Sequence, residues 1–202
     1  MRRIIPGLVC LGLLAVPALA QTADPQPTCD MCEGVYVPAA EIAAYSKKAV
    51  AEHRIDQQVR DIDIGKAHIA LGVEHRGKLD KPGPQAVAEH DQVSEVYHIL
   101  DGTATLKLGP RLVNKKRRPA DEETVRLYNG PGNNADDIEG GVSYDLKPGD
   151  VVFIPAGTGH LFSHIDDHID YIMVRIDPDK ITPLKDEAAS KGTLGDYYKG
   201  RP

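Results

Sequence analysis

The sequence predicts an all-β domain, a small barrel or sandwich, that follows a single N-terminal helix. From Val59 to Ile176, short runs rich in β-branched and aromatic residues are separated by Gly, Pro and Asp, which favour turns. Many short strands of this kind are typical of a barrel or a sandwich. By contrast, the residues from Pro38 to about His53 are rich in alanine and carry apolar side chains at helical spacing, and the proline suits a first helical turn.

These patterns divide the chain into segments. Residues 21–58 are expected to form a polar leader and the helix, and residues 59–178 the β domain. Residues 179–202 are expected to form a polar C-terminal tail with at most a short helix near 184–190. Within the β domain, strands are expected near 59–63, 67–75, 85–90, 94–100, 103–108, 142–146, 150–154, 159–165 and 168–176.

The first 20 residues have the features of an export signal. Arg2 and Arg3 precede an apolar run from Ile4 to Ala18, and small residues end the segment at Ala20. A positive start, a short apolar stretch and small residues at the cleavage point are what a signal peptidase recognises. The run is short for a permanent membrane helix, which is kept as the alternative. We expect cleavage after Ala20, no membrane attachment afterwards, and a periplasmic or secreted protein.

The charge balance argues against nucleic acid as a partner. The chain has 24 basic and 30 acidic residues, and loss of two arginines with the signal segment takes the net charge from −6 to about −8. An acidic surface repels phosphate backbones, and the absence of Trp and scarcity of Phe leave few side chains for stacking on bases. The basic run Lys115–Arg118 is interpreted as a solvated loop, because acidic residues at 121–123 follow it closely.

Two cysteines, Cys29 and Cys32, are left after the signal segment. In an oxidising compartment such a pair forms a disulfide, so we expect either a local structural disulfide or two inert thiols. A redox role would be better supported by a thioredoxin-like βαβ pattern, which is not apparent, and haem attachment would need a histidine where Glu33 stands. A redox or structural module based on this pair is kept as an alternative function.

A long segment with weak strand signals, residues 109–141, interrupts the β domain. It contains the basic run and a stretch rich in Gly and Asn at 129–134. Connections of this length are uncommon in compact domains unless they are functional or disordered. The segment is expected to be either a lid over one end of the barrel or an exposed, mobile insertion.

Two clusters of residues carry the functional argument. The more C-terminal of the two begins at Gly149, continues through a short apolar strand to Pro155 and Gly157, and ends at His160. These four residues match the second motif of the cupin superfamily at every spacing, although His164 stands where the family has Asn. The resemblance covers roughly residues 85–176 and implies a single cupin barrel of the jelly-roll, or double-stranded β-helix, type.

The first cluster matches the other cupin motif in part. His90, Glu95 and Gly102 take motif positions, while Ala88 replaces the first histidine. Because side chains alternate along a strand, Ala88 and His90 share one face, and Glu95 and Tyr97 share another. The Asp-Gly pair that ends at Gly102 predicts a tight turn at the end of this strand.

The resemblance implies a metal site inside the barrel, because inward His and Glu side chains of cupins commonly hold a divalent metal. The ligands would be His90, Glu95 and His160. Two imidazoles and a carboxylate suit iron, manganese, nickel, copper or zinc, and they leave positions open for water and substrate. The alanine at position 88 should weaken binding, and some cupins hold no metal. Cupins often pair through a barrel edge, so a homodimer is expected by resemblance only.

Tyr97 and His164 are the candidates for proton transfer beside the metal, because a histidine titrates usefully near neutral pH. His164 shares a face with His160 but lies about 13 Å away along the strand, so it is expected to line the cavity. Apart from the cysteine-based module, two functions stay open. One is a metal-dependent enzyme that acts on a small polar metabolite, and the other is a metal-free protein that binds a sugar or a small acid.

Overall fold

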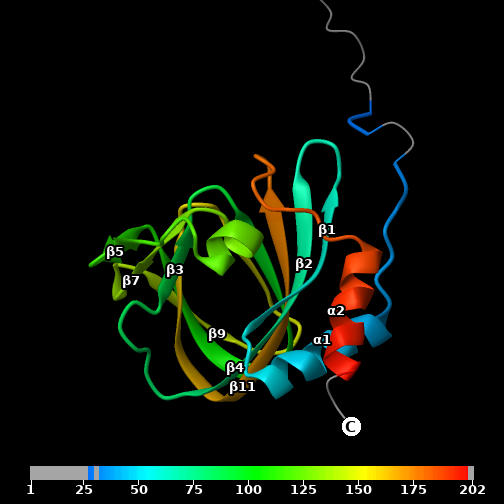
Figure 1. Ribbon diagram of the computed structural model, residues 1–202. Helices are drawn as coiled ribbons and strands as arrows, with labels where there is room; N and C mark the ends of the chain where they lie inside the picture. The colour runs from blue at the N-terminus through cyan, green and yellow to red at the C-terminus, as the bar shows by residue number, and fades with distance from the viewer. Residues whose placement is uncertain (1–26, 30–31, 200–202) are drawn as a thin grey trace, which may run out of the picture.

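The computed structural model describes residues 27–29 and 32–199, and the predicted signal segment lies outside them. The described chain forms an antiparallel β-barrel with two helices packed against one side, α1 (Ala39–Glu52) and α2 (Glu187–Lys199) (Figure 1). A π-helical turn, η1 (Val125–Asn129), lies between β6 and β7. The strands are β1 (Asp56–Asp63), β2 (His68–Leu79), β3 (Val87–His90), β4 (Ser94–Gly109), β5 (Arg111–Val113), β6 (Lys116–Arg117), β7 (Gly132–Ala135), β8 (Asp137–Glu139), β9 (Val142–Leu146), β10 (Val151–Ile154) and β11 (Gly159–Asp177).

Strand β11 is the centre of the main sheet. It pairs with β4 along most of its length, with β2 through its C-terminal half, and with β3 near its start, always antiparallel. β4 also pairs with β9 and β10, while β1 extends the sheet beyond β2. In the described chain, the outer strands β1 and β6 do not pair with each other, so hydrogen bonds do not close the barrel into a continuous ring.

Two pairs of expected strands are each one long strand. The strands expected at 94–100 and 103–108 form β4, and those at 159–165 and 168–176 form β11. The turn predicted at Gly102 was therefore wrong. Gly102 has a φ of 77°. The register between β4 and β11 shifts between Ile165 and Ile169, beside this glycine, and the shift is a β-bulge. The glycine lets the strand bend around the barrel where a turn was expected, and a side chain there would clash with the carbonyl of His168.

The segment 109–141 was expected to be a lid or an exposed, mobile insertion, but much of it belongs to sheets. β7 pairs with β3 and β6 pairs with β7, so both extend the main sheet, while β5 and β8 form a separate two-stranded sheet. Ala135 and Ile138 from this segment pack in a buried cluster with Val87 and Leu161. These short strands were missed because each has only two to four residues, and their apolar positions are few.

The predicted N-terminal helix is confirmed as α1, with Pro38 as its N-cap. α2 is a correction, because it begins later and runs longer than the short helix expected near 184–190. The two helices lie side by side against β1 and β2 (Figure 1). Tyr45 of α1 is fully buried, and its hydroxyl donates to the carbonyl of Ser190 at 3.0 Å. This contact ties the C-terminal segment to the helix and the barrel.

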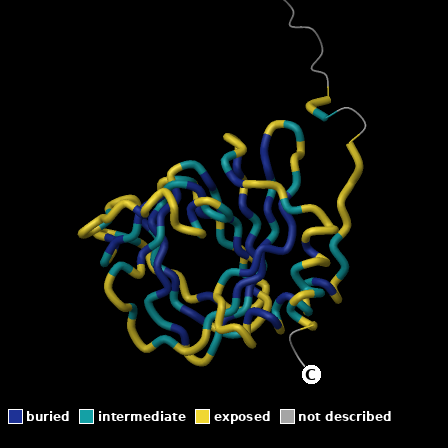
Figure 2. Tube along the Cα trace, viewed as in Figure 1, coloured by how far each residue is buried: buried dark blue, intermediate teal, exposed yellow. Residues whose placement is uncertain are grey.

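The interior of the barrel holds the largest core cluster, which includes Tyr97, Leu106, Phe162, Ile169 and Tyr171. Figure 2 shows buried residues along the strands and exposed residues mainly on the connections. The all-β fold class is confirmed. Among the described residues, no helix has the length and apolarity needed to cross a bilayer.

Candidate metal centre

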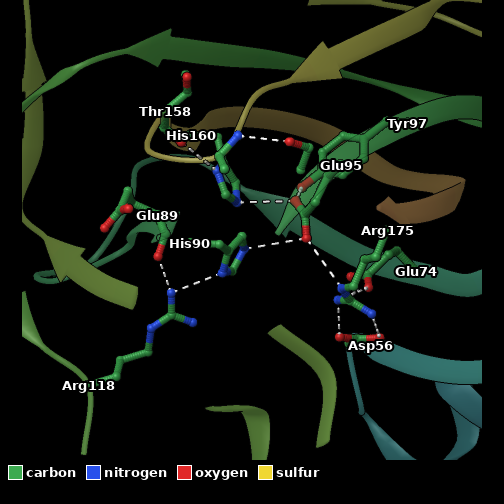
Figure 3. A network of polar contacts seen from close by, with 12 residues as sticks. Asp56, Glu74, Glu89, His90, Glu95, Tyr97, Arg118, Thr158, His160 and Arg175 are labelled. Atoms are coloured by element: carbon green, nitrogen blue, oxygen red, sulfur yellow. Dashed lines mark hydrogen bonds and ion pairs between the residues drawn. The ribbon is translucent and has the colours of Figure 1, made fainter. Parts of the chain in front are cut away.

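Three residues of the two motifs lie together inside the barrel. His90 ends β3, Glu95 lies near the start of β4, and His160 lies near the start of β11. They are 3%, 2% and 7% exposed, respectively. One ligand atom from each lies within 4.8 Å of the other two, and Figure 3 shows the three side chains pointing toward one another. The predicted convergence is therefore observed.

The distances suit a shared ion. Nε2 of His90 lies 3.3 Å from Oε1 of Glu95, and Nε2 of His160 lies 3.5 Å from Oε2 of the same carboxylate. Two ligand atoms, each about 2.1 Å from a metal at tetrahedral or octahedral angles, lie about 3 to 3.5 Å apart. The donor set of two imidazoles and one carboxylate also suits a divalent transition metal.

The corner of the second motif connects the two motifs directly. Gly157 has a φ of 79°, and its N–H donates to the carbonyl of His90 at 2.7 Å. The N–H of Ala156 donates to the hydroxyl of Ser94 at 3.0 Å, on the residue before Glu95. The left-handed conformation explains the glycine at 157, and the two hydrogen bonds hold the end of β3 and the start of β4 against the corner that precedes β11.

His160 is prepared to act as a ligand. Its Nδ1 lies 3.3 Å from the carbonyl of Thr158, and because a carbonyl can only accept, Nδ1 carries the hydrogen and Nε2 has a free lone pair. Burial and, to a lesser extent, the neighbouring His90 lower the pKa of His160 to about 4, although Glu95 acts in the opposite direction. The imidazole is therefore neutral near pH 7, and its free Nε2 faces Glu95.

His90 has the opposite arrangement. Nη2 of Arg118 lies 3.1 Å from its Nδ1, and because a guanidinium can only donate, Nδ1 accepts. The hydrogen of a neutral His90 is then on Nε2 and points to Oε1 of Glu95 (Figure 3). In this form Nε2 is not free to bind an ion, so metal binding through Nε2 of His90 requires Arg118 to leave Nδ1.

Glu95 is held by polar contacts on both oxygens. Oε2 accepts from the hydroxyl of Tyr97 at 2.8 Å, and Oε1 lies 3.4 Å from Nε of Arg175, which is itself paired with Asp56 at 2.5 Å. Burial would raise the pKa of Glu95, but the contact with His90 and the positive charge of Arg175 act against it, and the pKa is held well below its usual value. The carboxylate is therefore ionised and fixed in place.

Tyr97 lies beside the three candidate ligands, on the face predicted for it. Its ring packs against Tyr171 with centroids 4.6 Å apart and lies parallel to Phe162. Burial and the adjacent Glu95 raise the pKa of Tyr97 well above its usual value, so the phenol stays protonated. The hydroxyl can donate a hydrogen bond at the site, and its role in proton transfer stays a prediction.

His164 was expected to line the cavity, and the structure corrects this. Its side chain is 45% exposed, and Nε2 lies 3.1 Å from the carboxylate of Asp166. The register with β4 shifts between Phe162 and His164, so Ser163 is the extra residue of a β-bulge. The bulge reverses the alternation, and Phe162 stays in the interior while His164 turns to the surface.

Sequence reasoning missed two residues at the site. Arg118 was assigned to a solvated loop, but it is buried and reaches His90. The acidic residues that follow it favour a solvated loop, and no local pattern predicts its inward direction. Arg175 is buried in β11 beside Glu95. Strand alternation counted from Tyr171 would have placed it on the interior face.

Comparison with known proteins gives distant likenesses to solved structures. No protein-family model matches the sequence, and no curated protein matches it significantly. Among solved structures, a protein of Bacillus halodurans is similar at 11% identity and a TM-score of 0.39, over 81% of this chain and 98% of that one. A cupin protein of Bacteroides fragilis is similar at 14% identity and a TM-score of 0.34, over 58% of this chain and 72% of that one.

The DMSP lyase DddQ of Ruegeria pomeroyi is similar at 19% identity and a TM-score of 0.37, over 68% of this chain and 54% of that one. Likenesses this distant say nothing about activity. The two motifs, the antiparallel barrel and the meeting of His90, Glu95 and His160 inside it identify the fold of this chain as that of the cupin superfamily.

Proposed function

We propose that this chain is an exported cupin-type protein that holds one divalent transition metal through His90, Glu95 and His160 and acts on a small polar metabolite. The observation that supports the metal most directly is the contact between His160 and Glu95. The free lone pair of Nε2 and the ionised Oε2 face each other at 3.5 Å, and neither supplies a hydrogen to the other. Two acceptors at this distance are stabilised by a cation between them.

The surrounding residues would position the ligands and the substrate. Thr158 orients the imidazole of His160, while Arg175 and Tyr97 hold the carboxylate of Glu95. Contacts of this kind around metal ligands raise affinity by fixing their direction. A bound ion would supply Lewis acidity or a centre that activates oxygen. The phenol of Tyr97 donates its one hydrogen to Glu95, so it would assist a bound metabolite by exchanging that hydrogen bond for one to the metabolite.

Metal analysis tests this proposal. The full chain, purified without a histidine tag, should carry about one transition-metal ion, and His90→Ala and His160→Ala should each lose it. His168→Ala is the matched control, because His168 lies on the same strand as His160 but contacts Asp167 at 2.8 Å near the surface. A wild-type chain that stays empty after supplementation with iron, manganese, nickel, copper and zinc would refute the metal-dependent function.

A second candidate function is a metal-free protein that binds a small molecule in the same barrel. Two observations favour it: alanine replaces the first histidine of the motif at Ala88, and Arg118 holds His90 in the form whose Nε2 carries a hydrogen. Ala88→His separates the two candidates. If the barrel holds a metal, the added ligand should tighten binding. Metal binding that is present but unchanged would count against the alignment of Ala88 with the first motif histidine, and a variant as empty of metal as the wild-type chain would support the metal-free function.

Export is part of the proposal. It is supported by the signal-like residues 1–20 and by the disulfide between Cys29 and Cys32, because disulfides form and persist in oxidising compartments. Mass spectrometry of the chain recovered from the periplasm or medium should give a mature chain that begins at Gln21. An uncleaved chain retained in the cytoplasm would contradict export while leaving the barrel site untested by that result.

A further inference from the structure

Within residues 27–29 and 32–199, Arg118 is a buried cation without a carboxylate partner. It follows β6 in the segment 109–141, is 8% exposed, and has a backbone N–H that donates to Gly132. Its Nη2 contacts the carbonyl of Glu89 and Nδ1 of His90, which are both uncharged acceptors. Its Nε is buried and has no hydrogen-bond partner, and Arg118 forms no ion pair with any carboxylate in the described part of the chain.

Burying an unpaired charge is costly, so its retention calls for a physical reason. Three of the acidic side chains whose charges act on Arg118 are engaged elsewhere: Glu122 accepts from Thr124 at 2.9 Å, Glu89 accepts from Asn133 at 2.5 Å, and Asp91 pairs with Arg117 at 2.5 Å. Burial lowers the pKa of Arg118, with the surrounding acids acting against this only at longer range.

The backbone is shaped around this guanidinium. A side chain at Gly132 would clash with Nη2 of Arg118 and with the carbonyl of Glu89, so the glycine leaves the space that the guanidinium occupies. The arginine therefore fills a place that the neighbouring strands β3 and β7 keep open for it.

Charge counting at the site points to the missing partner. A divalent ion bound by two neutral imidazoles and one carboxylate gives the site a net charge of +1. Arg118 adds a second positive charge beside it. Metal binding through Nε2 of His90 moves the hydrogen of that ring to Nδ1, which then repels the guanidinium donor. Arg118 has to release His90, and it needs a new acceptor close to the ion.

We propose that Arg118 recognises the carboxylate group of a small organic acid bound at the site of His90, Glu95 and His160. The planar fork of a guanidinium matches a carboxylate in two parallel hydrogen bonds. The inference builds on the proposed barrel site and narrows its ligand to an acid, since an uncharged sugar would leave the guanidinium unpaired. The same residue serves the metal-bound and the metal-free protein.

Nuclear magnetic resonance of the full chain labelled with 15N-arginine tests this directly. Sodium acetate should shift the Nε–H signal of Arg118 with saturation, while acetamide, its uncharged counterpart, should not. Arg118→Gln removes that signal, which assigns it, and should weaken acetate binding about tenfold or more. Arg117→Gln is the matched control, because it removes the same charge from the preceding residue, whose side chain is 54% exposed. It should bind acetate as the wild type does.

The outcomes separate this inference from the metal proposal. An Arg118 signal that does not respond to acetate, or responds equally to acetamide, would overturn the proposal. These titrations are made on the wild-type chain, and the variant serves only to assign the signal. Inorganic phosphate that binds Arg118 more tightly than acetate would overturn the choice of a carboxylic acid. The titrations are run on the metal-free and on the zinc-supplemented chain. Acetate binding without zinc uptake would support carboxylate recognition by Arg118 and refute the proposed metal site. Zinc uptake without an acetate response would support the metal site and refute carboxylate recognition.

Discussion

The substitution Glu95→Gln keeps the shape of a side chain at the centre of the site and removes its charge. We expect it to destabilise the fold and to abolish metal binding. Glu95 is 2% exposed and contacts His90, His160, Tyr97 and Arg175 at distances between 2.8 and 3.5 Å. The amide group of glutamine would replace one carboxylate oxygen with an NH2 group. If that group takes the place of Oε1, its hydrogens face the donors of His90 and Arg175.

The size of the effect follows from the ion pair that is lost. Removing one partner of a buried pair costs about 3–5 kcal/mol, because the other charge stays buried without compensation. Arg175 keeps its contact with Asp56 at 2.5 Å, so part of its compensation survives. We therefore expect the free energy of unfolding to fall by about 3 kcal/mol, the lower end of that range.

Urea unfolding of the chelator-treated chain, followed by circular dichroism near pH 7, measures this effect without a contribution from lost metal. Glu139→Gln is the control, because Glu139 pairs with Arg111 at 3.5 Å and the two side chains are 72% and 69% exposed. That change should cost less than about 0.5 kcal/mol. A free energy of unfolding for Glu95→Gln within about 1 kcal/mol of the wild type would refute the view of Glu95 as a tightly paired buried carboxylate.

Two further outcomes follow from the barrel. Gly102→Ala should lower the free energy of unfolding by more than about 1 kcal/mol, since φ is 77° and the new methyl group meets the carbonyl of His168. Gly77→Ala is the control and should change this free energy little, because Gly77 pairs with His168 and a methyl group there meets no atom within 4 Å. Equal effects of the two substitutions in urea unfolding would contradict this. Burial, and to a lesser extent Asp177, raises the pKa of Asp61 to about 6, so the stabilising protonated form of the folded chain is lost as pH rises from about 4 through 6. Asp61→Asn should therefore show a flatter pH dependence of unfolding in that window, and parallel curves for the two chains would count against it.

The second motif could be located from the sequence because its requirements are local. Gly149 and Gly157 both have positive φ, which glycine adopts without strain, and His160 follows at a spacing set by the corner between two strands. The alternation of strand side chains also placed Glu95 and Tyr97 on one interior face. These features depend on a few neighbouring residues, so they can be predicted from one sequence alone.

Features that depend on pairing between distant strands could not be predicted in the same way. The bulge at Ser163 arises from the match of β11 to β4, and it moves His164 to the surface although alternation alone assigned it to the interior. The weak strands of the segment 109–141 form because β3 offers an edge to β7. Neither a bulge nor an available edge is visible in the residues themselves.

The sequence by itself determined the all-β class and the N-terminal helix, because periodicity and turn chemistry act over a few residues, and its resemblance to the cupin motifs implied the three candidate ligands His90, Glu95 and His160. Only the tertiary structure decided how those ligands are charged, oriented and covered. Arg118 and Arg175 reach the site from segments far along the chain, and their directions follow from packing and register across the barrel. The interaction of buried charges depends on distance in space, which the order of residues does not contain.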